Sequence, residues 1–236
     1  MTIAHRRVAG IGAGLVALFL AILVLLVIVL IADSVFGSSS STSGTAGSGR
    51  AVAQTRTVGP FRDVELAGSL VVNVGIGSPS VVVHADDNLV GRVTTRVLHD
   101  RLVVGTTNGD FRANAPTYVD VTVPAVSTVA LTGSGMLTLT GIAQRELTVL
   151  VPGSGLVRAS GRVDTLTVSM PGSGDAELRG LVAKKAHATL AGSGTIAVTA
   201  TDTLDGNVGG SGAILYAGNP LHVTTSVTGT GAITPS

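Results

Sequence analysis

The chain has 236 residues, of which 45% are hydrophobic, 3% aromatic and 12% charged. The absence of cysteine excludes disulfides and thiolate metal sites, and a net charge of +1 gives no electrostatic basis for binding nucleic acid. The 32 glycines are about twice the usual share of roughly 7%, so the glycine excess is the first feature to explain.

The first predicted element is a membrane-spanning helix over residues 8–32. These 25 residues carry no charged or strongly polar side chain, and about 20 suffice to cross a bilayer as a helix. Arg6 and Arg7 precede the segment and Asp33 follows it, so the positive-inside rule places residues 1–7 in the cytoplasm and the rest outside the cell. A cleaved signal peptide is the alternative, but its apolar region is shorter, about 7–15 residues. We therefore expect a single-pass protein of the cell membrane with an uncleaved anchor.

A linker rich in glycine and serine is predicted over residues 33–54. Its central part, Gly37 to Arg50, reads GSSSSTSGTAGSGR and has almost nothing to bury, so we expect it to be disordered. A Gly/Ser chain of these 14 residues has an r.m.s. span of roughly 20 Å. The linker is expected to hold one folded domain, residues 55–236, away from the membrane.

A Gly-x-Gly tripeptide recurs through the second half of the chain. It is Gly-Ser-Gly in five copies and Gly-Thr-Gly in the sixth, and successive copies are 20, 19, 20, 18 and 19 residues apart. In most copies, apolar residues stand two and four positions before the first glycine and two and four positions after the second. So regular a repeat predicts one supersecondary unit per copy. The repeated glycines are Gly133, Gly135, Gly153, Gly155, Gly172, Gly174, Gly192, Gly194, Gly210, Gly212, Gly229 and Gly231.

The apolar positions around each tripeptide alternate with period two, which predicts a β-strand with one buried face. The alternation continues through the tripeptide, so both glycines are expected on the inward side. The middle residue is then expected to point outward; we favour a role as the small residue of a tight corner, and binding of water, sugar or another protein is the alternative. This exposed ladder consists of Ser134, Ser154, Ser173, Ser193, Ser211 and Thr230.

Strands of this kind cannot bury their inner face alone, but identical coils stacked about 4.8 Å apart can. The sequence therefore predicts an all-β solenoid with coils of 18–20 residues. Glycine in the tripeptide lets the chain turn tightly and lie close to the next coil. A second corner is expected six residues after each tripeptide, at Gly141, Gly161, Gly180, Ala200 and Gly218.

The region from Thr55 to Val123 is also rich in β-strand signals but lacks the tripeptide. Turns are expected between its strands, including one at Asp86-Asp87-Asn88. We interpret this half as the N-terminal coils or cap of the same solenoid, because terminal repeats are normally atypical. Its expected strands cover residues 70–74, 81–84, 93–97 and 103–104, and a fifth follows from the alternation of Val119, Val121 and Val123, which Pro124 ends.

Several of these segments together resemble the putative autotransporter adhesin head GIN domain family. The resemblance covers about residues 55–236 and includes the Phe61-x-x-Val64 opening, the Asp87-Asn88-Leu89 turn and the stacked tripeptides. Its most specific part is the ending, Gly210-Ser211-Gly212-x-Ile214-x-Tyr216-x-Gly218-x-Pro220, followed by Gly229-x-Gly231-x-Ile233. The family implies a right-handed β-helix and a surface adhesin, and it brings no catalytic residues.

No catalytic, cofactor-binding or metal-binding residue is expected from the sequence. Zinc needs three or four converging ligands, whereas His187 and His222 are about two coils apart. Asp86-Asp87-Asn88 lacks the glycine-punctuated acidic loop typical of calcium sites, so a turn is expected there. Glu177 and Arg158 occupy outward positions on adjacent coils, where we expect a surface ion pair.

We therefore expect a membrane-anchored, extracytoplasmic β-helix that acts in adhesion or envelope interaction without catalysis or a cofactor. Its expected partners are the membrane, through residues 8–32, and an unknown envelope protein or glycan, with no nucleic acid. One alternative is an envelope polysaccharide enzyme, which needs convergent carboxylates such as Asp164 and Asp175. The other is a scaffold of solenoids stacked end to end, which needs an open last coil at Ile233.

Overall fold

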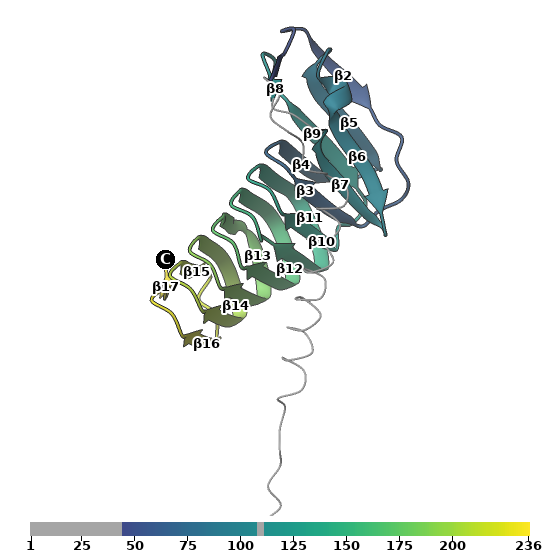
Figure 1. Cartoon of the computed structure of the whole chain (residues 1–236). Coiled ribbons are helices and arrows are strands. Elements are labelled where there is room, and N and C mark those ends of the chain that lie inside the picture. The colour runs from purple at the N-terminus through teal and green to yellow at the C-terminus, as the bar shows by residue number, and fades with distance from the viewer. Residues whose placement is uncertain (1–43, 108–110) are drawn as a thin grey trace, which may run out of the picture. The chain divides into compact units, whose positions relative to one another are not determined.

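The computed structural model describes residues 44–107 and 111–236, and these form an all-β solenoid (Figure 1). The one helical element in these two ranges is the short 3₁₀ turn η1 (Val90–Arg92). Across the described residues, no helix is long and apolar enough to cross a membrane. The predicted span at residues 8–32 and the stub at residues 1–7 lie outside the described residues.

Four long parallel strands make up the repeated coils. β11 and β12 each pass through the predicted second corner, where Gly141 and Gly161 have φ values of 72° and 132° that favour glycine. Each coil therefore contributes two straight segments joined by that corner, and the Gly-x-Gly tripeptide leads into the next coil. The strands are β11 (Met136–Leu150), β12 (Leu156–Met170), β13 (Asp175–Leu190) and β14 (Thr195–Val208).

The straight segments stack into two walls. In the first wall, Leu147 pairs with Leu166 and Leu166 with Ala186; in the second wall, Leu137 pairs with Val157. The first wall also contains β6 (Val93–Leu98), β7 (Arg101–Thr106), β3 (Asp63–Ala67), β10 (Thr128–Leu131) and β16 (His222–Val227). The second wall also contains β2 (Ala51–Thr55), β5 (Ser80–Asp86), β9 (Tyr118–Val123), β4 (Val71–Ile76), β15 (Ala213–Ala217) and β17 (Ala232–Pro235).

Aliphatic side chains fill the space between the two walls. Leu147, Leu166 and Leu204 each expose 1% or less of their surface, and the inward positions of neighbouring coils form one continuous cluster. Among the described residues, Phe61 is the one aromatic side chain in the buried core. The thin core explains the low aromatic content of the sequence, because large rings do not fit between walls lined by Val, Leu and Ala.

Both glycine columns of the tripeptide lie directly against the preceding coil. A Cβ at Gly153 would overlap the carbonyl oxygen of Gly133, and a Cβ at Gly155 would overlap that of Gly135. The same overlap with a carbonyl oxygen of the preceding coil recurs at all twelve repeated glycines, and none of the twelve has a positive φ. Glycine is therefore required here by the close approach of stacked backbones, whereas at the second corner Gly141, Gly161 and Gly218 have a positive φ that favours glycine.

The N-terminal half continues both walls, as predicted, but in an order that differs from the order of the chain. β3 and β4 pair with β10 and β11, although the chain reaches β10 only after passing through β5, β6, β7 and β9. β7 and β9 form the next coil outward, and β2, β5 and β6 close that end with antiparallel pairing. The five predicted strands correspond to β4, β5, β6, β7 and β9, whereas β3 was not predicted.

The linker prediction is wrong for residues 44–54, which belong to the folded domain. β1 (Thr45–Ala46) pairs with β8 (Phe111–Arg112), and β2 pairs with β5. The buried Asp86 carboxylate accepts hydrogen bonds from the backbone N–H groups of Gly49 at 2.6 Å, Asn114 at 3.0 Å and Ala115 at 3.1 Å. The physical reason is that partners distant in the sequence satisfy this backbone, which no local pattern shows. Residues 33–43 of the predicted linker lie outside the described residues.

Replacing Asp86 by asparagine is expected to release residues 44–50 from the domain. Burial raises the pKa of Asp86, but the backbone N–H groups of Ala115, Gly49 and Asn114 lower it more, so the pKa lies below the ordinary value of 3.8. The stabilisation is therefore present above pH 3.8 and is lost as the pH falls through the folded-state pKa. Tryptic cleavage after Arg50 should be faster in Asp86→Asn at neutral pH.

Hydrogen exchange at Gly49 provides the pH test of the Asp86 contact. In the wild type, protection of this amide should hold from neutral pH to about pH 4 and fall below it, after correction for the intrinsic exchange rate. In Asp86→Asn it should be low throughout. Asp205→Asn, which removes an exposed acid from a distant coil, serves as the control. Equal protection in the wild type and Asp86→Asn would show that the carboxylate does not hold the segment.

The inward column of side chains reaches the surface at β16. Val223 and Val227 of β16 are 44% and 45% exposed, and Leu221 just before β16 is 78% exposed. Within the described residues β16 and β17 each have a paired strand on one side only. The sequence contains no Asp, Glu, Lys or Arg after Asp205. The exposed apolar side chains and unpaired strand edges that end-to-end stacking of solenoids requires are therefore present at β16 and β17. The stacking itself stays a prediction.

Candidate functional site

The predicted ladder residues line one edge of the solenoid. All six are exposed, and the Ser211 hydroxyl donates to the Ser193 hydroxyl at 3.2 Å. Each ladder residue lies between two glycines that contact the preceding coil, so its backbone position is set by the stacking. The column is consequently a regular row of hydroxyl groups with one group per coil.

Ser69 adds a seventh hydroxyl that the sequence search missed. Gly68 lies beneath Gly133 in the stack, and its carbonyl oxygen accepts from the N–H of Gly135 at 3.0 Å. Ser69 is exposed, and Leu70 stands where the second glycine of a full tripeptide would be. Ser69 could have been found from the apolar residues two and four positions before Gly68. Their spacing matches that of the other copies, although the tripeptide itself is incomplete.

A shallow groove runs beside the ladder on the outer face of the second wall. One hollow of about 320 Å³ is lined by Ser69, Ser134 and Ser154 together with Val71, Met136 and Asp175. A second hollow of about 550 Å³ begins at Asp175 and continues over β13, β14 and β15. Because the two hollows share Asp175, the face offers one extended surface along the stack.

The expected ion pair lies on this face. Arg158 Nε and Glu177 Oε2 are 2.6 Å apart on neighbouring coils, which confirms the predicted surface pair. Their side chains are 48% and 54% exposed, so the pair contributes little to stability, about 0–1 kcal/mol. Asp175 also accepts a hydrogen bond from the backbone N–H of Thr195 at 2.9 Å. These contacts fix charged groups along the groove and leave its polar atoms accessible.

A polar and aromatic cluster continues the same face towards the N-terminal end. The rings of His84 and Tyr118 are stacked with centroids 4.3 Å apart, and Asp120 lies 3.2 Å from His84 Nε2 and accepts from Asn73 Nδ2 at 2.9 Å. Tyr118 pairs with Val71 and Asp120 with Asn73, which places them in the outward rows of the groove. The antiparallel pairing of β5 with β9 creates this cluster, and no local sequence pattern predicted it.

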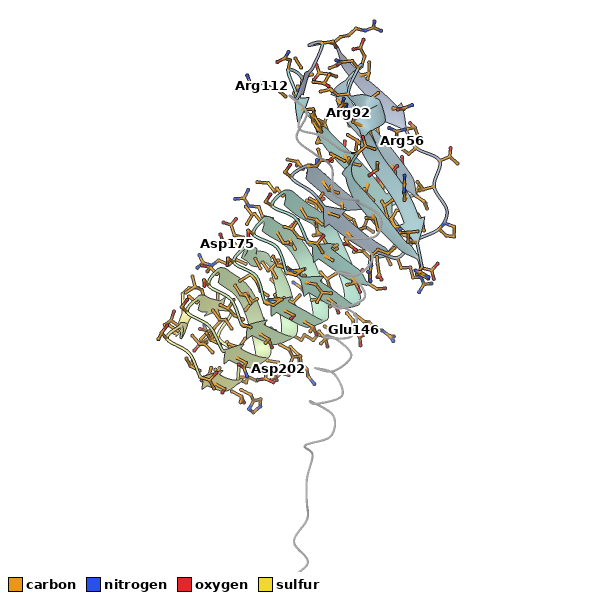
Figure 2. The ribbon with its side chains drawn as sticks, in the orientation of Figure 1. Arg56, Arg92, Arg112, Glu146, Asp175 and Asp202 are labelled. Carbon is orange, nitrogen blue, oxygen red and sulfur yellow. The ribbon has the colours of Figure 1, made fainter. Side chains whose placement is uncertain are left out.

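The acidic residues proposed for the enzymatic alternative do not converge. Asp164 lies in the first-wall part of β12 and contacts Lys184 Nζ at 2.6 Å, whereas Asp175 lies beside the ladder on the second wall. Figure 2 shows Asp175 on one side of the coils and Glu146 and Asp202 on the other. Over residues 44–107 and 111–236, no three His, Asp or Glu side chains form a group that could hold a metal ion.

The contact with Lys184 lowers the pKa of Asp164, first through a hydrogen bond and second through its charge. Among the described residues, the other strongly buried acid besides Asp86 is Glu65, whose carboxylate lies 3.5 Å from Arg101. Burial raises the pKa of Glu65, and Arg101 and Thr132 act in the opposite direction. Each of these acids has its own local partner, so they form separate contacts instead of one reactive site.

Comparison with known proteins agrees with the solenoid architecture. The family profile described as "Putative auto-transporter adhesin, head GIN domain" matches residues 60–220. No curated protein matches the chain. A crystal structure of a putative adhesin from Bacteroides fragilis is similar with a TM-score of 0.65 and 19% sequence identity, covering 82% of this chain and 100% of that one.

A second solved structure has the same arrangement. It is a putative lipid binding protein from Parabacteroides distasonis, with a TM-score of 0.56 and 21% identity, covering 82% of this chain and 100% of that one. At these identities the likeness establishes the fold, and the surface of each protein has to be considered on its own.

Proposed function

This chain belongs to the auto-transporter adhesin head GIN domain family, and we propose that it is a non-catalytic adhesion module of the cell envelope. The surface that makes contact is the outer face of the second wall. The observation that carries the proposal is the continuous groove along the exposed hydroxyl ladder, which extends over several coils. Residues 8–32 anchor the module in the membrane with the folded domain outside the cell.

The shape of this face favours an extended partner. Both hollows are shallow and follow the stack, whereas a small-molecule site is normally a deeper, mostly apolar cleft. The ladder repeats its hydroxyl groups about every 4.8 Å, which suits a polymer with a similar repeat. The groove offers hydroxyls, the Arg158–Glu177 pair and the half-buried Tyr118 ring. An envelope glycan lying along the solenoid axis fits this combination best.

The membrane anchor gives the adhesion surface its location. The predicted span precedes the described residues by a short segment rich in serine, residues 33–43. The module is held on the outer side of the membrane, where its groove meets envelope polymers.

The experiment measures retention of a fragment comprising residues 38–236 on cell walls isolated from the cells that produce the protein. This fragment corresponds to the compact unit Ser38–Ser236 and contains the whole described core. Replacing Ser134 and Ser154 by glutamine places two long neutral side chains in the groove. We expect this double variant to bind about tenfold more weakly, a loss of about 1.4 kcal/mol, because the new side chains block part of the contact surface.

The matched control carries Thr148→Gln and Thr167→Gln, which place the same side chains on neighbouring coils of the first wall. It should bind like the wild type. Equal binding by the wild type and both double variants would locate the contact surface away from the ladder. Circular dichroism of all three proteins checks that the solenoid is intact.

A further inference from the structure

A pocket of about 670 Å³ lies at the N-terminal end of the solenoid, away from the hydroxyl ladder. It opens between the loop Arg56–Arg62 and the segments around Ser80 and Pro124. This volume falls within the roughly 300–1,000 Å³ typical of small-molecule sites. The pocket belongs to the cap of antiparallel strands, so it is a feature of the region without tripeptides.

The walls of the pocket are mostly apolar. Val58, Phe61, Val81 and Val123 line it; Phe61 and the two strand valines belong to the buried core, and Val58 packs against that core. Prolines and Ala125 form the outer part of the wall. An apolar cavity of this kind favours a hydrocarbon ligand, because each buried CH₂ group strengthens binding about fourfold.

Two arginines supply the charge of the pocket, and its lining contains no acidic residue. Arg62 is exposed, and no carboxylate among the described residues lies within 4 Å of its guanidinium. Arg56 is partly occupied, since its Nη2 donates to the backbone oxygens of Val90 at 2.7 Å and Val93 at 3.4 Å. The Arg56 Nε is buried and has no hydrogen-bond partner among the described residues. A single anionic group at the pocket therefore meets positive charge and no competing acid.

The backbone of the loop beside the pocket is hydrogen-bonded only at its two ends. The backbone N–H of Arg56 donates to the carbonyl oxygen of Val81 at 2.8 Å, and that of Arg62 donates to the carbonyl oxygen of Asp100 at 2.9 Å. The intervening residues 57–61 make no backbone hydrogen bond within the described part of the chain. A second hollow of about 680 Å³ lies on the other side of this loop, beside β6. The loop therefore has room to move aside when a chain-like ligand enters.

We propose that this pocket binds one long-chain fatty carboxylate, with the hydrocarbon chain against the apolar lining beside the loop Arg56–Arg62 and the carboxylate at Arg62. The apolar lining selects the chain, and the unpaired guanidinium selects the anionic head. The volume suits one acyl chain. This binding activity is separate from the proposed adhesion surface and stands without it.

The test is displacement of a fluorescent fatty acid from the fragment 38–236 by palmitate, below its aggregation concentration. Palmitate should bind saturably, and affinity should increase from the 8-carbon to the 12-carbon and 16-carbon acids until the pocket is full. Methyl palmitate, which lacks the charge, should bind about five- to tenfold more weakly. Absence of saturable binding would overturn the proposal.

Two substitutions test the binding of the hydrocarbon chain and the binding of the carboxylate separately. Ala125→Trp fills the exposed part of the lining and should abolish displacement, and Arg62→Gln should weaken palmitate about five- to tenfold while leaving methyl palmitate unchanged. Arg112→Gln is the matched control, because Arg112 is also exposed on the cap but lies on the opposite side from Arg56 (Figure 2).

The control variant should bind palmitate like the wild type. If Ala125→Trp binds normally while its urea midpoint is unchanged, the ligand does not occupy this pocket. If Arg62→Gln weakens methyl palmitate as much as palmitate, the arginine acts through packing and the assignment of the carboxylate is wrong. Unchanged urea midpoints of the variants exclude unfolding as the cause of lost binding.

Discussion

Replacing Gly192 by alanine is expected to destabilise the solenoid by roughly 3 kcal/mol, although only one methyl group is added. The new Cβ would overlap the carbonyl oxygen of Gly172 on the preceding coil, so backbone and not a flexible side chain must move. The φ of Gly192 is not positive. A role based on conformation alone therefore predicts the opposite sign, since alanine at a compatible φ stabilises by about 0.4–1 kcal/mol through the unfolded state.

The measurement is urea unfolding of the fragment 38–236 followed by circular dichroism. Ser193→Ala is the matched control in the same tripeptide: it loses an exposed hydrogen bond with Ser211 and should change stability by less than about 0.5 kcal/mol. An increase in the midpoint for Gly192→Ala would show that the coils tolerate a wider spacing than the structure indicates. A decrease with an unchanged slope identifies the close approach of coils as the reason for the repeated glycine.

Replacing Leu166 by alanine is the second change with a large expected effect. Leu166 is fully buried in the first wall between Leu147 and Ala186, so its removal leaves a cavity that two fixed coils cannot close. Substitutions of this kind cost about 2–5 kcal/mol, and we expect about 3 kcal/mol here. Urea unfolding at several protein concentrations gives the free energy of unfolding for the variant.

The comparison variant is Ile233→Ala in β17. Ile233 packs against the core from a half-buried position, so the same chemical change should cost only about 1 kcal/mol. A difference between the two positions is expected because each coil contacts only its neighbours, and stability in such a stack depends on the number of neighbours. Equal losses at both positions would contradict the nearest-neighbour account.

The repeated part of the fold was predictable because its information is local and redundant. The spacing of the tripeptides indicates the coil length, and the alternation through Gly153-Ser154-Gly155 indicates which atoms face outward. The pairing of Arg158 with Glu177 follows from that register and is present. The structure shows why glycine repeats at these positions: stacked backbones approach closely there, and neither Gly153 nor Gly155 has a positive φ that would explain it by conformation.

The cap and part of the candidate site could not be predicted, because they depend on pairing between segments that share no period. Asp86 holds Gly49 from 37 residues away, so a stretch with the composition of a disordered linker becomes part of the domain. His84 and Tyr118 meet through the antiparallel pairing of β5 and β9. Neither contact has a signature within a window of a few residues.

The amino-acid sequence by itself determined the coil length, the inward and outward faces and the hydroxyl ladder of this protein. Only the tertiary structure decided that β3 and β4 stack against β10 and β11, that residues 44–54 are folded and that a pocket opens beside Phe61. The physical reason is that a repeat stabilises the same contact in every coil, so its pattern is visible along the chain. A cap forms from single long-range contacts, and these are selected by the burial and hydrogen bonding of the complete fold.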